Sequence, residues 1–160
     1  MFVHDTIPFR QKKDMAIFRG KIRQSRVRTK FLEMFFHHPM FDCGVVGRNE
    51  GKFIMALEGN DVASNLKWVM SSNSLAVMTR PTCETWFMEG TLVAGYHYVE
   101  VKEDFSDLPE KLQYYIEHPE QAEDIIRHAH EYIRQFQDKE RENLISLMVL
   151  DKYFRLSGQQ

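Results

Sequence analysis

Short apolar runs alternate with amphipathic segments up to residue 101, and only helical periodicity follows. The runs typical of strands are residues 16–18, 43–46, 53–57, 74–78 and 98–101. Segments with helical spacing separate them, at residues 25–37, 62–70 and 85–88, and Ser25 is suited to be the N-cap of the first. Strands that alternate with helices are typical of βαβ units. We therefore predict an α/β, Rossmann-like domain with a mostly parallel sheet.

The rest of the chain, from Asp107 to Leu156, has a helical pattern throughout. One apolar stripe of this region comprises Ala122, Ile125, Ile126, Ala129, Ile133 and Phe136, and Pro119 suits the first turn of that helix. A second stripe comprises Leu144, Leu147, Met148 and Tyr153. We expect one domain over residues 1–160, with an α/β core at 8–105 and C-terminal helices at 106–156.

Composition excludes a disordered tail, a collagen-like chain and a disulfide-stapled miniprotein. Hydrophobic residues make up 43% of the 160 residues and charged residues 28%, as is ordinary for a globular domain. The sequence contains no run of about 18 apolar residues, so no transmembrane helix is predicted. Cys43 and Cys83 lie far apart without a Cys-x-x-Cys motif, so neither a disulfide framework nor a zinc knuckle is indicated. We expect a reducing, cytoplasmic setting.

Positive charge is concentrated at the start of the chain. Residues 1–30 carry nine Lys and Arg against Asp5 and Asp14, a net charge of +7, so the remainder carries −9. This concentration of positive charge predicts an anionic ligand near the N-terminal end of the chain. An overall pI of about 6.4 argues against a nucleic-acid binder. A small phosphate-bearing ligand fits better.

The motifs of several site classes are missing. The sequence has no G-x-G-x-x-G, no Walker A pattern, no H-E-x-x-H and no Asp-x-Asp. The seven histidines show no spacing typical of metal ligands. We therefore expect no metal site and no cofactor.

The basic segment 18–28 is the first candidate site. Arg19 lies between an apolar strand and Gly20, close to a helix N-terminus, and this arrangement favours a diphosphate clamp. Arg23 and Arg26 follow within the same segment. A solvated basic helix face is the alternative, and it is the favoured interpretation for Arg28 and Lys30.

Two further polar segments follow predicted strands. In residues 57–68, Asn60 or Asp61 can simply cap the next helix, whereas Ser64, Asn65 and Lys67 could contact a ligand. In residues 81–90, Glu84 and Glu89 could hold a ribose or sugar hydroxyl. The alternative there is a short capped helix with Trp86 in the core, which that segment alone favours.

Five segments together resemble glycosyltransferase family 90, over roughly residues 8–155. This family includes bacterial lipopolysaccharide-modifying transferases and eukaryotic protein O-glucosyl- and O-xylosyltransferases. The segments are Phe18-Arg19-Gly20 with the arginines after it, Glu58-Gly59-Asn60-Asp61-Val62-Ala63-Ser64-Asn65-Leu66-Lys67-Trp68, Ser72-Asn73-Ser74-Leu75, Glu84-Thr85-Trp86-Phe87-Met88-Glu89-Gly90 and Tyr96-His97-Tyr98-Val99-Glu100-Val101. The Glu-Gly-Asn-Asp form resembles the bacterial branch. Eukaryotic members tend to have arginine where Asn65 stands, so that donor contact does not transfer.

The resemblance implies a metal-independent, inverting transferase of two Rossmann-like domains (GT-B), of which this chain matches the C-terminal half. Its substrates would be a nucleotide-sugar, expected to be a UDP-sugar, and a lipopolysaccharide or other surface glycan. The general base would belong to an N-terminal domain with no counterpart here, so we expect a fragment, a truncated gene or a split partner. The location would be cytoplasmic, with peripheral attachment to the inner membrane as an option.

The donor-binding residues expected from the resemblance and the local patterns form one set; no catalytic residue is assigned. They are Arg19, Gly20, Arg23, Arg26, Gly59, Asn60, Asp61, Ser64, Asn65, Lys67, Glu84 and Glu89. The competing hypothesis is a non-catalytic α/β remnant or partner-binding module that retains the fold.

Overall fold

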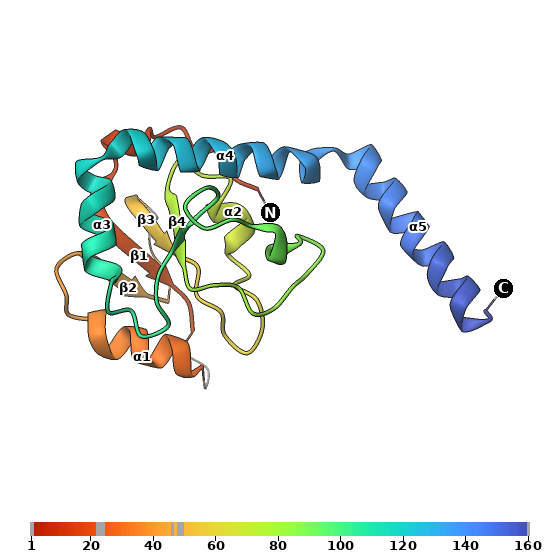
Figure 1. Cartoon of the computed structure of the whole chain (residues 1–160), viewed down its shortest axis with the longest axis horizontal. Coiled ribbons are helices and arrows are strands. Elements are labelled where there is room, and N and C mark those ends of the chain that lie inside the picture. The colour runs from red at the N-terminus through yellow and green to blue at the C-terminus, as the bar shows by residue number, and fades with distance from the viewer. Residues whose placement is uncertain (1, 22–24, 46, 48–49, 160) are drawn as a thin grey trace.

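The computed structural model describes residues 2–21, 25–45, 47 and 50–159 of the chain, and it contains a five-stranded sheet (Figure 1). The strands are β1 (Lys13–Arg19), β2 (Phe41–Gly44), β3 (Gly51–Met55), β4 (Leu75–Met78) and β5 (Val99–Glu100). Their order is β2-β1-β3-β4-β5, and each neighbouring pair is parallel. The predicted α/β, Rossmann-like fold is confirmed.

Helices cover both faces of this sheet. The helices of the described chain are α1 (Arg26–Phe35), α2 (Leu66–Val69), α3 (Leu108–Glu117), α4 (Pro119–Gln137) and α5 (Lys139–Ser157), with short 3-10 turns η1 (Phe9–Gln11) and η2 (Glu89–Thr91), and all of these helices except α5 bury residues against the sheet. Alternate residues of a strand point to opposite faces, so Phe18 packs with α1 and α3 while Ile17 packs with α2. Helix α4 contributes to both cores, because Ala122 lies in the first and Ile133 in the second.

Several predicted elements are confirmed. Ser25 is the N-cap of α1, and its Oγ accepts a hydrogen bond from the Arg28 N–H at 3.3 Å. Pro119 is the first residue of α4, and the six-residue stripe of that helix is buried. Both features depend on local chemistry and on the 3.6-residue period.

Other predicted elements are wrong. The helix expected at 62–70 is only the single turn α2, because the Asp61 carboxylate accepts from the adjacent Val62 N–H at 2.8 Å instead of capping a helix. Residues 85–88 form no helix, since Met88 has a left-handed φ of 56° and η2 begins only after it. Trp86 is 51% exposed, which contradicts the interpretation that placed it in the core.

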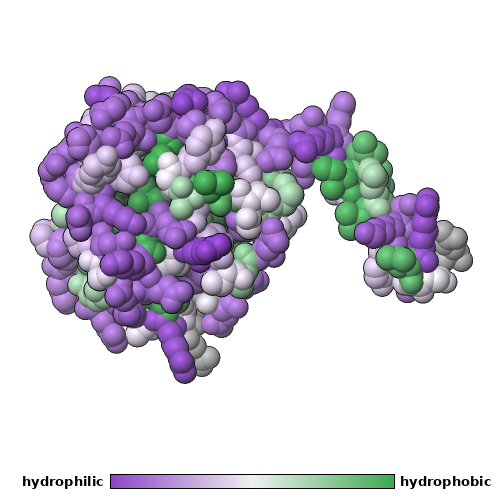
Figure 2. All heavy atoms as spheres, viewed as in Figure 1, coloured by the Kyte–Doolittle hydropathy of each residue, from purple (hydrophilic) through white to green (hydrophobic). Residues whose placement is uncertain are grey.

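Helix α5 differs from the other long helices. It extends away from the body of the domain, and all of it belongs to the described part of the chain (Figure 1). It has no buried residue, so the second predicted stripe is exposed to solvent, and apolar side chains of α5 stand out in Figure 2. Within the described residues, no helix combines the length and apolarity needed to cross a membrane.

Candidate functional site at the carboxyl edge of the sheet

The loops after β1, β3 and β4 meet at the carboxyl edge of the sheet. The chain leaves β1 toward β2 on one side and returns to β3 on the other, so the strand order reverses between β1 and β3. In open parallel sheets, ligands bind beyond the strand ends at this kind of switch point. Ser25 joins two of the loops, because its Oγ donates to the Glu58 carbonyl at 3.4 Å.

Arg28 is the central cation of this edge. Its Nε and Nη2 donate to the Leu57 carbonyl at 3.3 and 3.0 Å, and its Nη1 donates to the Lys21 carbonyl at 3.0 Å. Desolvation lowers the pKa of this guanidinium. A Cβ added to Gly59 would lie only 3.2 Å from Arg28 Cζ, so the glycine lets the β3 loop approach it closely.

All the hydrogen bonds of Arg28 in the described part of the chain therefore go to backbone carbonyls, and none goes to a carboxylate. Carbonyl groups orient a guanidinium without cancelling its charge, so its field remains for an incoming anion. The sequence interpretation assigned Arg28 to a solvated face and missed this position. The available signal was its place three residues after the N-cap Ser25, in the first turn of α1.

Glu58 joins the β3 loop to the β4 loop. Its carboxylate accepts from the Thr82 N–H at 3.0 Å, from the Cys83 N–H at 3.2 Å and from the Thr82 hydroxyl at 2.6 Å. With three partners, this carboxylate orders the edge of the site.

Lys67 and Glu89 form an ion pair beneath the loops. The Lys67 ammonium lies 2.8 Å from Glu89 Oε1, and the side chains are only 5% and 2% exposed. Burial alone would raise the pKa of Glu89, but bonds from Lys67 and Thr85 outweigh it and leave that pKa below its ordinary value. Because both side chains are almost completely buried, little of either is accessible to a donor, and the pair instead joins α2 to η2.

Arg19 is directed to the opposite side of β1. Its Nη1 donates to the Asp42 carbonyl at 2.7 Å and to Asp42 Oδ1 at 3.1 Å, and its Nη2 pairs with Oδ2. The Arg19 hydrogen bond lowers the pKa of Asp42. Only 12% of the Arg19 side chain is exposed, and its bonds to Asp42 join β1 to β2, whereas Arg28 contacts the segment after β3, the neighbour of β1 on its other side.

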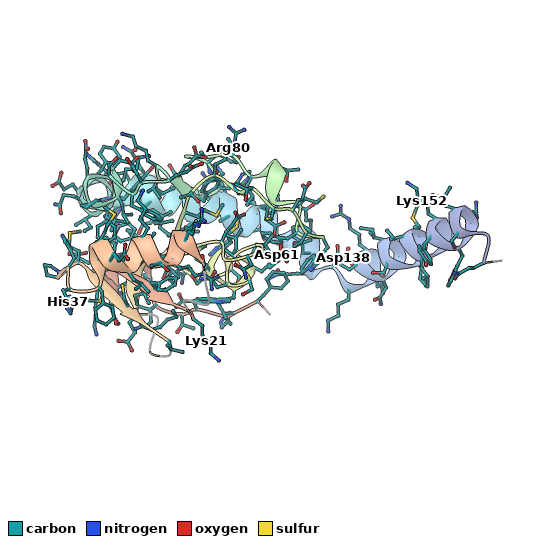
Figure 3. The ribbon with its side chains drawn as sticks, turned by 90° about the horizontal axis from the view of Figure 1, so that it is seen from below. Lys21, His37, Asp61, Arg80, Asp138 and Lys152 are labelled. Carbon is teal, nitrogen blue, oxygen red and sulfur yellow. The ribbon has the colours of Figure 1, made fainter. Side chains whose placement is uncertain are left out.

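The other predicted donor residues differ in exposure. Gly20 donates its N–H to the Gly44 carbonyl at 3.0 Å and lines a hollow of about 240 Å³ beside β2. Asn65 is half-buried and donates to the Met55 carbonyl at 3.0 Å. Gly59 is half-buried, whereas Arg23 lies outside the described residues. The exposed members are Arg26, Asn60, Asp61, Ser64 and Glu84, and Figure 3 shows Lys21, which precedes α1, projecting from the body.

Metal ligands do not gather at this edge. Across the described residues, no group of three or more His, Cys, Asp and Glu side chains is placed to hold an ion. The Arg28 guanidinium, the N-terminus of α1 and Gly59 lie together at this edge, and exposed polar residues follow Gly59 in the chain. This combination suits an anion that also carries hydroxyl groups.

The parallel sheet and the loops at its switch point define an α/β domain of the Rossmann-like class. Residues 38–157 match the model of glycosyl transferase family 90, which is well over half of the chain. The chain belongs to this family, as its sequence motifs predicted. The O-glucosyltransferase LpsA of Dichelobacter nodosus is 43% identical over 173 aligned residues, which cover 98% of this chain and 54% of that protein. The chain thus spans about half the length of this curated relative.

Proposed function

We propose that this chain is the donor-binding part of a glycosyltransferase that uses a nucleotide-sugar, expected to be a UDP-sugar. Membership of family 90 and the likeness to an O-glucosyltransferase support transfer of a sugar. The observation that carries the donor assignment is Arg28, a cation that has no carboxylate partner among the described residues and that lies at the N-terminus of α1 and against Gly59.

Glycosyl transfer releases a nucleoside diphosphate, which gathers negative charge as the glycosidic bond breaks. Fixed positive charge near the departing phosphates stabilises that charge without a metal ion. Arg28 and the N-terminus of α1 would supply it, with Arg26 reaching in from the first helical position. Asn60, Asp61, Ser64 and Glu84 are exposed polar groups that would bond donor hydroxyls.

The acceptor, which we propose to be a lipopolysaccharide or another surface glycan, must lose a proton to a general base. The carboxylates of this edge are poor candidates for that base. Glu58 accepts three hydrogen bonds, and Glu89 is buried in its ion pair. Asp61 accepts from Val62, and Glu84 is assigned to donor hydroxyls. We therefore assign the base to a further domain, which a relative about twice as long has room to contain.

On this proposal, the 160-residue chain alone binds nucleotide weakly and transfers no sugar. A half-open site leaves the donor in contact with water, and water weakens each electrostatic contact. The proposal includes a cytoplasmic setting, with peripheral attachment to the inner membrane. A non-catalytic, partner-binding module remains the second candidate, and the exposed apolar helix α5 is the observation that favours it.

Titration calorimetry with UDP and UDP-glucose tests the donor assignment. Arg28→Lys keeps the charge but loses the planar fork, so we expect several-fold weaker binding. Arg19→Lys should have the smaller effect because Arg19 is paired with Asp42. Arg127→Ala, at an exposed pair on α4, is the matched control and should bind as the parent does.

Two results would contradict this assignment. If the Arg28→Lys variant and the parent bind UDP with equal affinity, Arg28 does not contact the donor. If Arg19→Lys loses more affinity than Arg28→Lys, Arg19 is the arginine that binds the diphosphate. A chelator tests metal independence separately. Nucleotide binding should be unchanged in excess EDTA. Loss of binding that manganese restores would refute metal independence.

A further inference from the structure

Glu58 opens the Glu-Gly-Asn-Asp motif, but the donor contacts proposed above do not include it. It follows β3, the strand that lies between β1 and β4 in the sheet. Its half-buried side chain reaches the β4 loop, which comprises residues 79–98. Because β3 lies between those two strands, Glu58 is placed to connect the loops that follow them.

The backbone at Glu58 contacts the end of the site that we assign to the donor phosphates. Its carbonyl accepts from the Ser25 hydroxyl at 3.4 Å, and Ser25 is the N-cap of α1. The preceding carbonyl, that of Leu57, accepts from Arg28 Nη2 at 3.0 Å. The peptide unit between Leu57 and Glu58 therefore joins β3 to the helix N-terminus and to the central guanidinium.

The carboxylate of Glu58 holds the β4 loop. Its Oε1 accepts from the N–H groups of Thr82 and Cys83 at 3.0 and 3.2 Å, and its Oε2 accepts from the Thr82 hydroxyl at 2.6 Å. All three partners donate, so both oxygens act as acceptors, as they can in an ionised carboxylate. A glutamine offers one acceptor oxygen, and an alanine offers none.

Glu84 is the residue whose position these contacts determine. It is exposed and follows Cys83 directly. On its other side, the Thr85 N–H donates to Glu89 Oε2 at 2.7 Å, so the residues before and after Glu84 are each held by another carboxylate. A Cβ added to Gly90 would lie 3.1 Å from Glu84 Oε1, so the glycine leaves room for this side chain. The loop thus presents the Glu84 carboxylate from a backbone that is held on both sides.

We propose that Glu58 is a positioning residue of the donor site, which holds the β4 loop so that Glu84 meets donor hydroxyl groups while Arg28 meets the phosphates. This inference rests on the proposed donor site. A loop that is already ordered costs less entropy on binding, so the contribution of Glu84 to affinity depends on the Glu58 carboxylate. The contribution of Arg28 does not, because the backbone carbonyl of Leu57 orients it.

Titration calorimetry with two probes separates these contributions. Inorganic pyrophosphate carries phosphates alone, whereas UDP-glucose also carries hydroxyl groups. We expect Glu58→Ala to bind UDP-glucose about fivefold more weakly than the parent, and to bind pyrophosphate within about twofold of it. Glu58→Gln keeps one acceptor oxygen for the two N–H groups, so it should recover part of the loss. Glu131→Ala, which removes an exposed carboxylate from α4, is the matched control and should bind both probes as the parent does.

A double-mutant cycle tests whether Glu58 acts through Glu84. Glu84→Ala should weaken UDP-glucose binding and spare pyrophosphate. Adding Glu58→Ala to it should cause little further loss, because the held loop then no longer presents a carboxylate. Losses that add fully would show that Glu58 acts by another route and would overturn the proposal.

Thr82→Val is a second variant that removes only the hydroxyl bond to Glu58 and leaves both N–H groups in place. It should show the same selective loss to a smaller extent, and it keeps the test decisive if Glu58→Ala does not fold by circular dichroism. If Arg28→Lys weakens both probes but the Glu58 and Thr82 variants weaken neither, or both equally, the donor site stands and the positioning role is refuted. If the parent binds neither probe, the donor site is refuted together with this inference.

Discussion

Replacing Lys67 with Met tests the buried pair beneath the candidate site. The change keeps most of the side-chain volume beside the Phe87 ring, which lies 5.3 Å from the Lys67 ammonium, but it leaves Glu89 without its cation. Removing one partner of a buried pair typically costs about 3–5 kcal/mol of unfolding free energy. For a domain of this size each kcal/mol lowers Tm by about 2–4 °C, so we expect a decrease of about 10 °C.

The unfolding free energy that Lys67→Met loses should depend on pH. In the parent the pKa of Glu89 is lowered below 4.5, so the carboxylate contributes stability that is present above its unfolded pKa and lost as pH falls through the folded pKa. Without Lys67, burial dominates and raises that pKa, so the variant loses stability as pH rises through it. The difference between parent and variant should therefore be larger at pH 7 than at pH 4.

Urea unfolding at the two pH values measures this difference. Lys67→Met with Glu89→Leu should recover much of the loss, since no buried charge is then left unpaired. Arg127→Met, which breaks an exposed pair on α4, should cause no measurable change. A deficit in Lys67→Met below about 1 kcal/mol and equal at both pH values would refute the burial argument.

Three further results are expected. Gly51→Ala should destabilise the domain by about 1–3 kcal/mol in urea unfolding, because the new Cβ would lie 2.6 Å from the Met15 carbonyl oxygen; an unchanged midpoint would contradict this close approach. Burial first, and the nearby Asp42 charge second, raise the pKa of Cys43 to about 11, so mass spectrometry at pH 8 should show much slower alkylation of Cys43 in the folded than in the unfolded chain. The purified chain should release no sugar to a glycan acceptor, and turnover that Glu84→Gln abolishes would place the base here.

Elements that depend on neighbouring residues could be predicted from the sequence. The start of α1 follows from a serine whose hydroxyl reaches the Arg28 N–H, three residues away. The buried face of α4 follows from its periodicity, and most strands follow from apolar runs bounded by polar turns, whereas the run expected at 43–46 corresponds to a strand at Phe41–Gly44. The prediction failed at 62–70 and at 85–88, where the Asp61 carboxylate and the left-handed Met88 stop helix formation.

The candidate site depends on contacts between distant residues. Arg28 reaches Leu57, which is 29 residues away, and Lys67 meets Glu89 across 22 residues. The place of Arg28 in the first turn of α1 could be predicted from the sequence, but the carbonyl that orients its guanidinium lies 29 residues away and could not. For that reason the sequence favoured Arg19 and passed over Arg28, although both belong to one basic segment.

The sequence by itself determined the class of fold and the end of the sheet where polar loops gather, because periodicity and capping act over a few residues. It determined the family through the order of its motifs along the chain. Only the tertiary structure decided which charges are paired and which side chains are covered. Both α4 and α5 carry apolar side chains, yet six residues of α4 are buried and none of α5 is. Periodicity gives a helix an apolar surface, but what lies against that surface depends on the path of the rest of the chain.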